Sequence, residues 1–211
     1  MEADRGSGGR ADAELAVSSA LALASITAVL KDLLENGLAQ RGVTSELGGD
    51  TTVSALPPDR IASGTDERAQ LNLFLYHVTP YTSLRERSNG GRGALSLDLH
   101  YLLSVYGAHD FQAEILLGHA LQLLHAHPVL ERDYIRTSLQ ALSAPHEGRV
   151  LPPAVAALGA AGLADSVQSL RIVPEFLTTE EMSKLWSAFQ ARFRPSATYR
   201  VSAAVIEQAV V

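Results

Sequence analysis

The stretch LSLDLHYLLSVY, residues 95–106, decides the fold of this protein. Apolar residues stand at every second position along it, which is the period of a β-strand. One face of this strand is therefore predicted to be core. The other face is mixed, because it carries Asp98 and His100 as well as Leu102. The alternating core residues are Leu95, Leu97, Leu99, Tyr101, Leu103 and Val105.

Four other segments have the character of strands. Residues 51–56 are rich in threonine and valine and end at Pro57, which predicts an edge strand. Residues 71–78 are apolar on both sides, as in a strand that is covered on two faces. Residues 166–173 and 199–205 complete a predicted set of five strands.

Three further segments have helical spacing. From Val17 to Leu34 the apolar residues recur with the helical period, and Gly37 is the predicted end of that helix. A second helix precedes Pro128, and a short third helix covers residues 132–142. The predicted core stripe of the second helix is Phe111, Ile115, Leu116, Ala120, Leu123 and Leu124.

A fourth helix has the clearest start in the chain. Thr178 is a predicted N-cap with Glu181 three residues later, which is a capping box, and Leu177 faces Met182 as a hydrophobic staple. The order of elements is helix, three strands, two helices, strand, helix, strand. This order predicts an α+β fold with a mixed, mainly antiparallel sheet of about five strands flanked by helices.

The domain organisation follows from the composition along the chain. Residues 1–14 contain glycines and charges without a helical or strand period, so we expect a flexible leader there. Residues 15–211 are expected to form a single α+β domain that ends in a strand. The stretch 143–164 is rich in alanine, glycine and proline, which predicts a surface loop.

Composition excludes several classes of protein. The 211 residues include 17 Lys plus Arg against 23 Asp plus Glu, a formal charge of -6, and 46% are hydrophobic. This acidic balance argues against a dedicated nucleic-acid binder. No run is long and apolar enough to span a membrane. The chain has no cysteine, which excludes disulfides, a thiol nucleophile and cysteine-based metal sites.

No constellation of residues predicts catalysis, a cofactor or a metal. His119, His125 and His127 do not converge on one ion from a helix, and the pattern G-x-S-x-G is absent. The glycines at 90, 91 and 93 precede a strand rather than a helix, unlike a phosphate-binding loop. Asp98 and His100 are either an acid–base couple or a cross-sheet hydrogen-bonding pair, and the second interpretation is favoured.

Two features predict contacts with other proteins. Arg85, Arg87 and Arg92 form a small basic cluster on a loop, where guanidinium groups suit carboxylates of a partner, although a solvated turn is the simpler interpretation. The C-terminal strand ends in apolar residues, and such ends pair with an internal neighbour or with another subunit. The candidate interface residues of this strand are Tyr199, Val201, Ala203, Val205 and Val210.

Several of these segments resemble one known family. They are TTVSALPPD at 51–59, QLNLFLYHVT at 70–79, LDLHYLLSVY at 97–106, FQAEILLGHALQLL at 111–124 and TTEEMSKLWSAFQARFRP at 178–195. Together they resemble the cap, or tail-terminator, family of extracellular contractile injection systems, which are phage-tail-like particles. The resemblance spans residues 17–207, and residues 178–205 are its most specific part.

The resemblance implies a structural role without enzymatic activity. Members of the family form a ring, expected to be a hexamer, at the end of the particle distal to the baseplate. The implied partners are further copies of the chain, the inner tube protein and the sheath protein, with no nucleic acid and no membrane. Synthesis is expected in the bacterial cytoplasm, and the particle is either kept there or released. The alternative is an adaptor domain that recruits a protein partner, and an enzyme is a more distant third.

Overall fold

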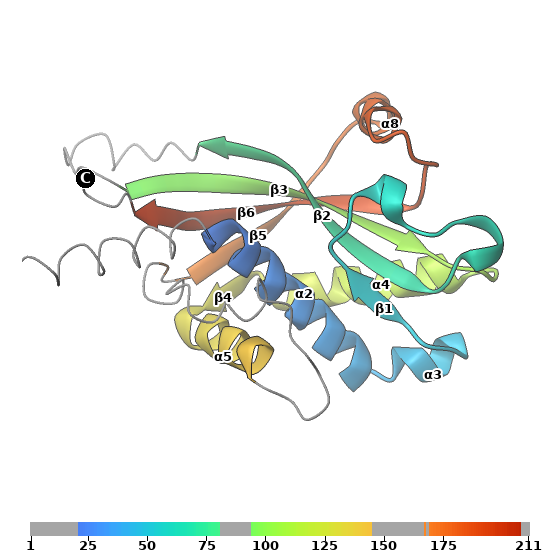
Figure 1. The fold of residues 1–211 in the computed structure, drawn as a ribbon, viewed down its shortest axis with the longest axis horizontal. Coiled ribbons are helices and arrows are strands. Elements are labelled where there is room, and N and C mark those ends of the chain that lie inside the picture. The colour runs from blue at the N-terminus through green and yellow to red at the C-terminus, as the bar shows by residue number, and fades with distance from the viewer. Residues whose placement is uncertain (1–20, 81–93, 145–166, 168, 208–211) are drawn as a thin grey trace, which may run out of the picture.

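A six-stranded sheet organises the computed structural model, which describes residues 21–80, 94–144, 167 and 169–207 (Figure 1). The strand order is β1-β2-β3-β6-β5-β4, and β1 with β2 is the one parallel pair in it. The strands are β1 Thr52–Ser54, β2 Gln70–Pro80, β3 Ala94–Tyr106, β4 Val129–Glu131, β5 Ser169–Glu175 and β6 Ser196–Glu207. The predicted α+β fold with a mainly antiparallel sheet is confirmed. The sheet has one strand more than expected, because three-residue β4 is too short for a periodic pattern.

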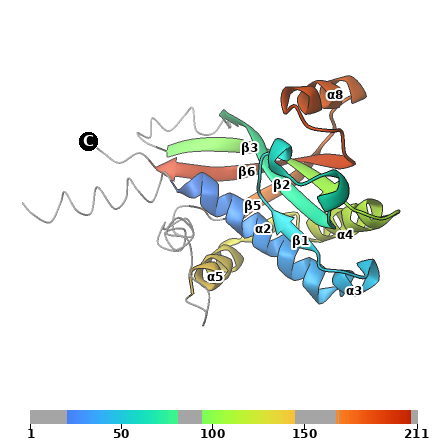
Figure 2. The same cartoon turned by 45° about the vertical axis from the view of Figure 1, so that its right-hand side comes forward.

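Helices cover the two faces of the sheet unequally. Figures 1 and 2 show α2, α4 and α5 on one side, while α8 stands on the opposite side. The helices are α2 Ala22–Gln40, α3 Val43–Leu47, α4 Gln112–Ala126, α5 Arg132–Ser143 and α8 Thr179–Ala188. Two short 3-10 helices, η1 Pro58–Arg60 and η2 Gly64–Asp66, lie between β1 and β2.

Strand β3 forms the centre of the core, as the alternation predicted. The described residues of its core face, from Leu97 to Val105, are buried beneath the main helical layer. On the opposite face Leu102 and Ser104 are also buried. Part of the cover there comes from the end of α8, where Phe189, the residue after the helix, places its ring edge-on to Phe74 of the neighbouring β2 at 5.4 Å between centroids. Both faces of the sheet are therefore packed around β3.

The first helix does not end where the sequence predicted. Gly37 lies inside α2 and is buried, and the helix continues to Gln40. The chain leaves the helical region at Gly42, whose φ of 69° is a conformation that favours glycine. The expectation for Gly37 was wrong because this glycine serves a contact between helices, with Leu123 of α4 packed against its Cα.

The second helix was placed correctly, but two of its predicted core residues face outward. Phe111 precedes α4 with a φ of 67° and is 72% exposed, and Ile115 is 38% exposed. The core stripe is Leu116, Ala120, Leu123 and Leu124. Phe111 and Ile115 lie on the next face around the helix, which is turned away from the sheet.

The remaining predictions agree with the structure to within a few residues. Strand β1 lies at an edge, and α5 spans the predicted third helix. The described part of the predicted strand 166–173 overlaps β5, which ends two residues later than predicted. The capping box of Thr178 and Glu181 is present. The staple of Leu177 and Met182 stays a prediction, as does the leader, which falls outside the described residues.

Candidate functional site

The C-terminal strand occupies the middle of the sheet rather than a free edge. Tyr199 pairs with Tyr101 of β3 on one side and with Pro174 of β5 on the other. Val201 is likewise paired with Leu99 and Ile172. Both side chains are buried. The backbone of this part of β6 is therefore paired on each side by a strand of the same chain. A strand from a partner can join here only by displacing β3 or β5.

Beyond Ser202 the situation of β6 changes. The pairing with β5 ends at the register Arg171 to Ser202, whereas the pairing with β3 continues to Glu207. Ala203 is the extra residue of a β-bulge, since Leu97 pairs with Ala204 and Asp98 with Ser202. Among the described residues, the stretch 203–207 has a strand neighbour on one side only. This stretch includes the predicted interface residues Ala203 and Val205 and leaves a sheet edge that can accept a strand.

The other predicted interface residues fall outside the described part of the chain. They are Arg85, Arg87, Arg92 and Val210. The loop that carries the arginines connects β2 to β3, which run antiparallel. Its two ends, Pro80 and Ala94, emerge at the end of the sheet where β6 also reaches Glu207. The topology thus brings the start and finish of this loop to the end of the sheet that holds the free stretch of β6.

The polar face of β3 carries a hydrogen-bonded cluster that spans the sheet. His100 Nε2 lies 2.9 Å from Thr79 Oγ1 of β2, and His100 Nδ1 lies 2.8 Å from Glu175 Oε2 of β5. Both ring nitrogens are therefore occupied. This arrangement agrees with the cross-sheet interpretation of His100, but its partners are Thr79 and Glu175 rather than Asp98.

Asp98 belongs to a separate and weaker contact. Its Oδ2 lies 3.8 Å from Nη1 of Arg200 on β6, and its buried Oδ1 has no hydrogen-bond partner among the described residues. Asp98 and His100 share one face of β3 but do not bond to each other. The favoured prediction of a hydrogen-bonding pair of Asp98 and His100 is therefore wrong, because His100 bonds to Thr79 and Glu175 instead, and the alternative of an acid–base couple between the two residues has no direct contact to support it.

The titratable groups with shifted pKa values have structural causes. Burial raises the pKa of Tyr101, which lies in the core with its hydroxyl 2.9 Å from Thr27 Oγ1. The pKa of Tyr76 is raised by burial and by the nearby carboxylates of Glu175 and Glu181. The backbone N–H of Thr178 in the capping box lowers the pKa of Glu181. None of these groups is poised near neutral pH for proton transfer.

The described residues contain no group of three side chains that could hold a metal ion. His119 and His127, which are near in sequence, have separate partners: Nε2 of His119 lies 2.7 Å from Glu46 Oε2, and Nδ1 of His127 lies 2.9 Å from the Leu123 carbonyl. No helix in this part of the chain has the length and hydropathy to cross a bilayer.

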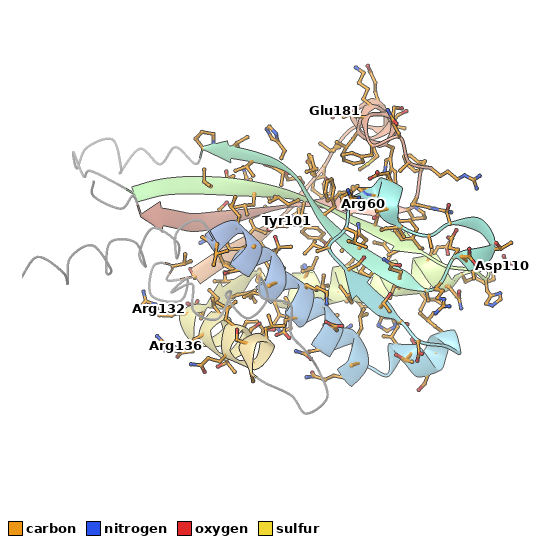
Figure 3. All side chains as sticks on the ribbon, in the orientation of Figure 1. Arg60, Tyr101, Asp110, Arg132, Arg136 and Glu181 are labelled. Atoms are coloured by element: carbon orange, nitrogen blue, oxygen red, sulfur yellow. The ribbon has the colours of Figure 1, made fainter. Side chains whose placement is uncertain are left out.

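Sequence reasoning missed two hollows of about 520 Å³ each that lie beside α4. One is apolar and is lined by α4, β5 and Tyr199. The other is lined by α4 and by Glu46 of α3, with Gly118 in its lining. Gln122 lines both. The sequence indicated a second apolar face on this helix, because Phe111 and Ile115 are one helical turn apart. Both residues had been assigned to the predicted core stripe instead. Figure 3 shows the side chains on this helix and labels Asp110 just before it.

Comparisons with known proteins place the chain in a family. The family model described as the Pvc16 N-terminal domain matches residues 25–211. No curated protein matches the chain. The solved structures that match it include a sheath/tube terminator of an extracellular contractile injection system termed PVC in its extended state, at 18% identity and a TM-score of 0.43. They also include the tube terminating cap of the anti-feeding prophage, at 16% identity and a TM-score of 0.46.

The two matches cover 82% of this chain but 55% and 53% of the solved chains. The chain therefore spans about half the length of the solved proteins it matches.

Proposed function

The chain belongs to the Pvc16 N-terminal domain family, and on that premise we propose that it is a cap, or tail terminator, of a contractile injection system. In this role copies of the chain form a ring, taken to be a hexamer, at the end of the particle distal to the baseplate. The ring ends the inner tube and anchors the last ring of the sheath. The function is structural, and no catalytic step is assigned to the chain.

The observation that carries this proposal is the extent of the family match. Residues 25–211 include every strand and nearly all of every helix described above, so the match concerns the whole fold. The proposal also takes residues 15–211 as one domain and residues 1–14 as a leader. A ring of identical copies needs two different surfaces on each copy that bind each other, because such heterologous contacts close into a circle.

We place the joint with the sheath at residues 203–207 of β6. This stretch is paired by β3 on one side, and among the described residues no strand pairs its other side, which supports a backbone joint to an incoming strand. Such a joint depends on the backbone, and it would hold while the sheath changes shape. The doubly paired part of β6, from Thr198 to Ser202, anchors the joint in the sheet.

Two truncations test the joint. A chain ending after Ser202 keeps the doubly paired part of β6 and loses the free stretch, whereas a chain ending after Glu207 keeps the whole strand and loses Val210. We expect the first to release the sheath from the cap in electron micrographs of particles and the second to retain it. Retention of the sheath by the shorter chain would exclude this joint. Equal loss of the sheath with both truncated chains would mean that the joint lies beyond Glu207, in the region of Val210.

The second proposed contact joins the loop of Arg85, Arg87 and Arg92 to acidic groups on the last ring of the tube. Reversal of all three charges to glutamate is expected to give tubes of uncontrolled length. Alanine at the same positions is the matched control, because it removes the attraction without adding repulsion and should have a smaller effect. A normal length distribution with the glutamate variant would remove this contact from the proposal.

Imaging of particles from a strain that lacks this protein tests the function as a whole. Loss of a terminator should leave tubes that are overlong or ragged and that have shed their sheaths. Particles of normal length and full sheath would overturn the proposal. Complementation with the intact chain should restore defined ends, which separates loss of this protein from effects on its genetic neighbours.

A further inference from the structure

The outer edge of β2 is paired over its first residues only. β1 lies beside Gln70–Asn72, whereas β2 continues to Pro80 (Figure 1). Beyond Leu73, the strands that the structure describes pair with β2 on its β3 side alone. The regular part of this open edge ends at the register shift between Leu75 and His77. An open edge of this kind offers backbone N–H and C=O groups to another strand.

The backbone groups of Leu73 and Leu75 point outward from this edge. Thr52 N–H donates to the Ala69 carbonyl at 3.3 Å, and the groups that face one neighbouring strand belong to every second residue. The residues of β2 that face β1 are therefore the odd-numbered ones. The pairing of β1 ends at Ser54, so the ladder uses the Leu73 N–H last. The Leu73 C=O and the Leu75 N–H are the next groups in line.

The side chain of Asn72 keeps the chain after β1 away from these two groups. In a continued parallel ladder, Leu56 would donate its N–H to the Leu73 C=O and would accept from the Leu75 N–H. Instead, Asn72 Oδ1 accepts the Leu56 N–H and Asn72 Nδ2 donates to the Leu56 C=O, each at 2.9 Å. Ser54 Oγ also donates to Asn72 Oδ1 at 2.7 Å, and Asn72 is fully buried. A firmly held amide thus leaves the edge open at Leu73 and Leu75.

A hollow of about 360 Å³ lies between α2 and this part of β2. Its strand wall is the run from Leu73 to Leu75. Its helix wall is one face of α2, formed by Ala24, Thr27, Ala28 and Lys31. The polar groups of this wall already have partners, since the Thr27 hydroxyl is 2.9 Å from the Tyr101 hydroxyl and Lys31 Nζ is 2.8 Å from Glu35 Oε2. The hollow therefore suits an uncharged, apolar side chain.

We propose that the slot between α2 and residues 73–75 of β2 binds an extended segment of another protein. The segment adds as a strand beside β2, bonds through its backbone to the Leu73 C=O and the Leu75 N–H, and places one apolar side chain in the hollow. Only an extended chain meets both features, because a helix uses its backbone groups internally and an apolar small molecule has none. The slot lies on the other side of β3 from residues 203–207 and does not depend on the proposed function.

Amide hydrogen exchange of the full chain, followed by NMR, tests whether the slot is open. The Leu75 N–H should exchange at least ten times faster than the Phe74 N–H, which faces β3 in the same strand. Equal protection of the two amides in a monomer would mean that the edge is already occupied, and would overturn the proposal. A dimer that protects the Leu75 N–H and exposes it on dilution would make the occupant a second copy, which would also overturn it.

Asn72→Ala tests why the slot is open. This change releases Leu56 to continue the ladder, so the Leu75 N–H should become at least ten times better protected, whereas a merely structural loss would lower protection. Ser54→Ala is the matched control, because it removes one bond to Asn72 and leaves both bonds between Asn72 and Leu56. No gain of protection in a folded Asn72→Ala chain would contradict the role given to Asn72 and the open edge inferred from it.

A defined peptide tests the occupant. The probe is a blocked heptapeptide in which threonine alternates with apolar residues, with leucine at the centre and valine on each side. We expect saturable binding in NMR titrations, with the Leu75 N–H protected in the complex. N-methylation of either the threonines or the apolar residues should weaken binding at least tenfold while the other leaves it intact, since alternate residues face β2. Equal effects of the two would exclude addition as a strand.

A change in the hollow links this binding to the slot. Ala24→Phe fills the hollow from an exposed position of α2 and should weaken peptide binding at least tenfold. Ala39→Phe is the matched control, because it makes the same change at an exposed position of the same helix outside the hollow. Absence of saturable binding at millimolar peptide, or binding that Ala24→Phe leaves unchanged, would overturn the proposal.

Discussion

Gly37 of α2 packs directly on Leu123 of α4. A Cβ atom at position 37 would lie 2.5 Å from Leu123 Cδ2 and 2.8 Å from Cδ1, well inside van der Waals contact. Both residues are buried. The distance between the two main helices on this face of the sheet is thus set by the absence of a side chain at position 37.

Gly37→Ala should therefore destabilise the fold, although alanine favours a helix. Overpacking costs about 1–3 kcal/mol, and the gain in helix propensity returns up to about 1 kcal/mol. The matched control is Gly118→Ala in α4, where a Cβ has open space and only the propensity gain remains. Urea denaturation of dilute protein should show opposite signs for the two variants. Stabilisation by Gly37→Ala would mean that Leu123 moves aside without cost.

Thr178→Ala should loosen α8 in particular. The Thr178 hydroxyl accepts from the Glu181 N–H at 3.2 Å, and loss of such an N-cap costs about 1 kcal/mol. Hydrogen exchange of the α8 amides is the appropriate measurement, and exchange should rise there while β3 is unaffected. Thr178→Ser, which keeps the hydroxyl, should behave like the parent chain. Uniform acceleration across the sheet would indicate that α8 does not open separately.

The same capping box makes α8 sensitive to acid. The pKa of Glu181 is lowered in the fold by the Thr178 N–H. The stability that the Glu181 carboxylate gives to α8 is therefore present above the ordinary pKa of 4.5 and is lost as the pH falls through the lower pKa of the folded state. The protection of α8 amides should fall over that acidic range. Glu181→Gln should remove most of this pH dependence, and an unchanged profile in that variant would assign the effect to another carboxylate.

Tyr101 should resist titration until the protein unfolds. Burial raises its pKa, so the neutral phenol stabilises the fold below the ordinary value of 10.0, and this contribution is lost as pH rises above it. Phenolate absorbance should show one tyrosine that ionises together with alkaline unfolding. Tyr101→Phe should remove that late step and, by loss of the contact with Thr27, cost about 1 kcal/mol. A late step that persists in Tyr101→Phe would belong to another buried tyrosine.

His100→Ala should destabilise the sheet more than Asp98→Asn. The first change leaves Thr79 and the partly buried Glu175 without the imidazole that joins them, at a cost of about 1–3 kcal/mol. The second alters a buried carboxylate whose Oδ1 has no hydrogen-bond partner among the described residues and whose Oδ2 lies 3.8 Å from Arg200 Nη1, so it removes less favourable interaction. Thermal unfolding at neutral pH distinguishes them. A larger effect of Asp98→Asn would mean that the Arg200 contact is the stronger one.

The sequence determined those features of this protein that depend on near neighbours along the chain. The alternation from Leu97 to Val105 predicted β3, and the pair of Thr178 and Glu181 predicted the start of α8, because strand period and helix capping involve residues a few positions apart. Resemblance of whole segments to a known family indicated the class of protein.

Only the tertiary structure decided which surfaces are free and which are buried. Tyr199 and Val201 were predicted as candidates for contact with a partner protein, yet β3 and β5 pair with them on both sides. Gly37 was predicted to end a helix, but it lies where two helices are in contact. Phe111 was predicted to lie in the core, but it is exposed. In each case the outcome depends on residues distant in sequence, whose positions no local period specifies.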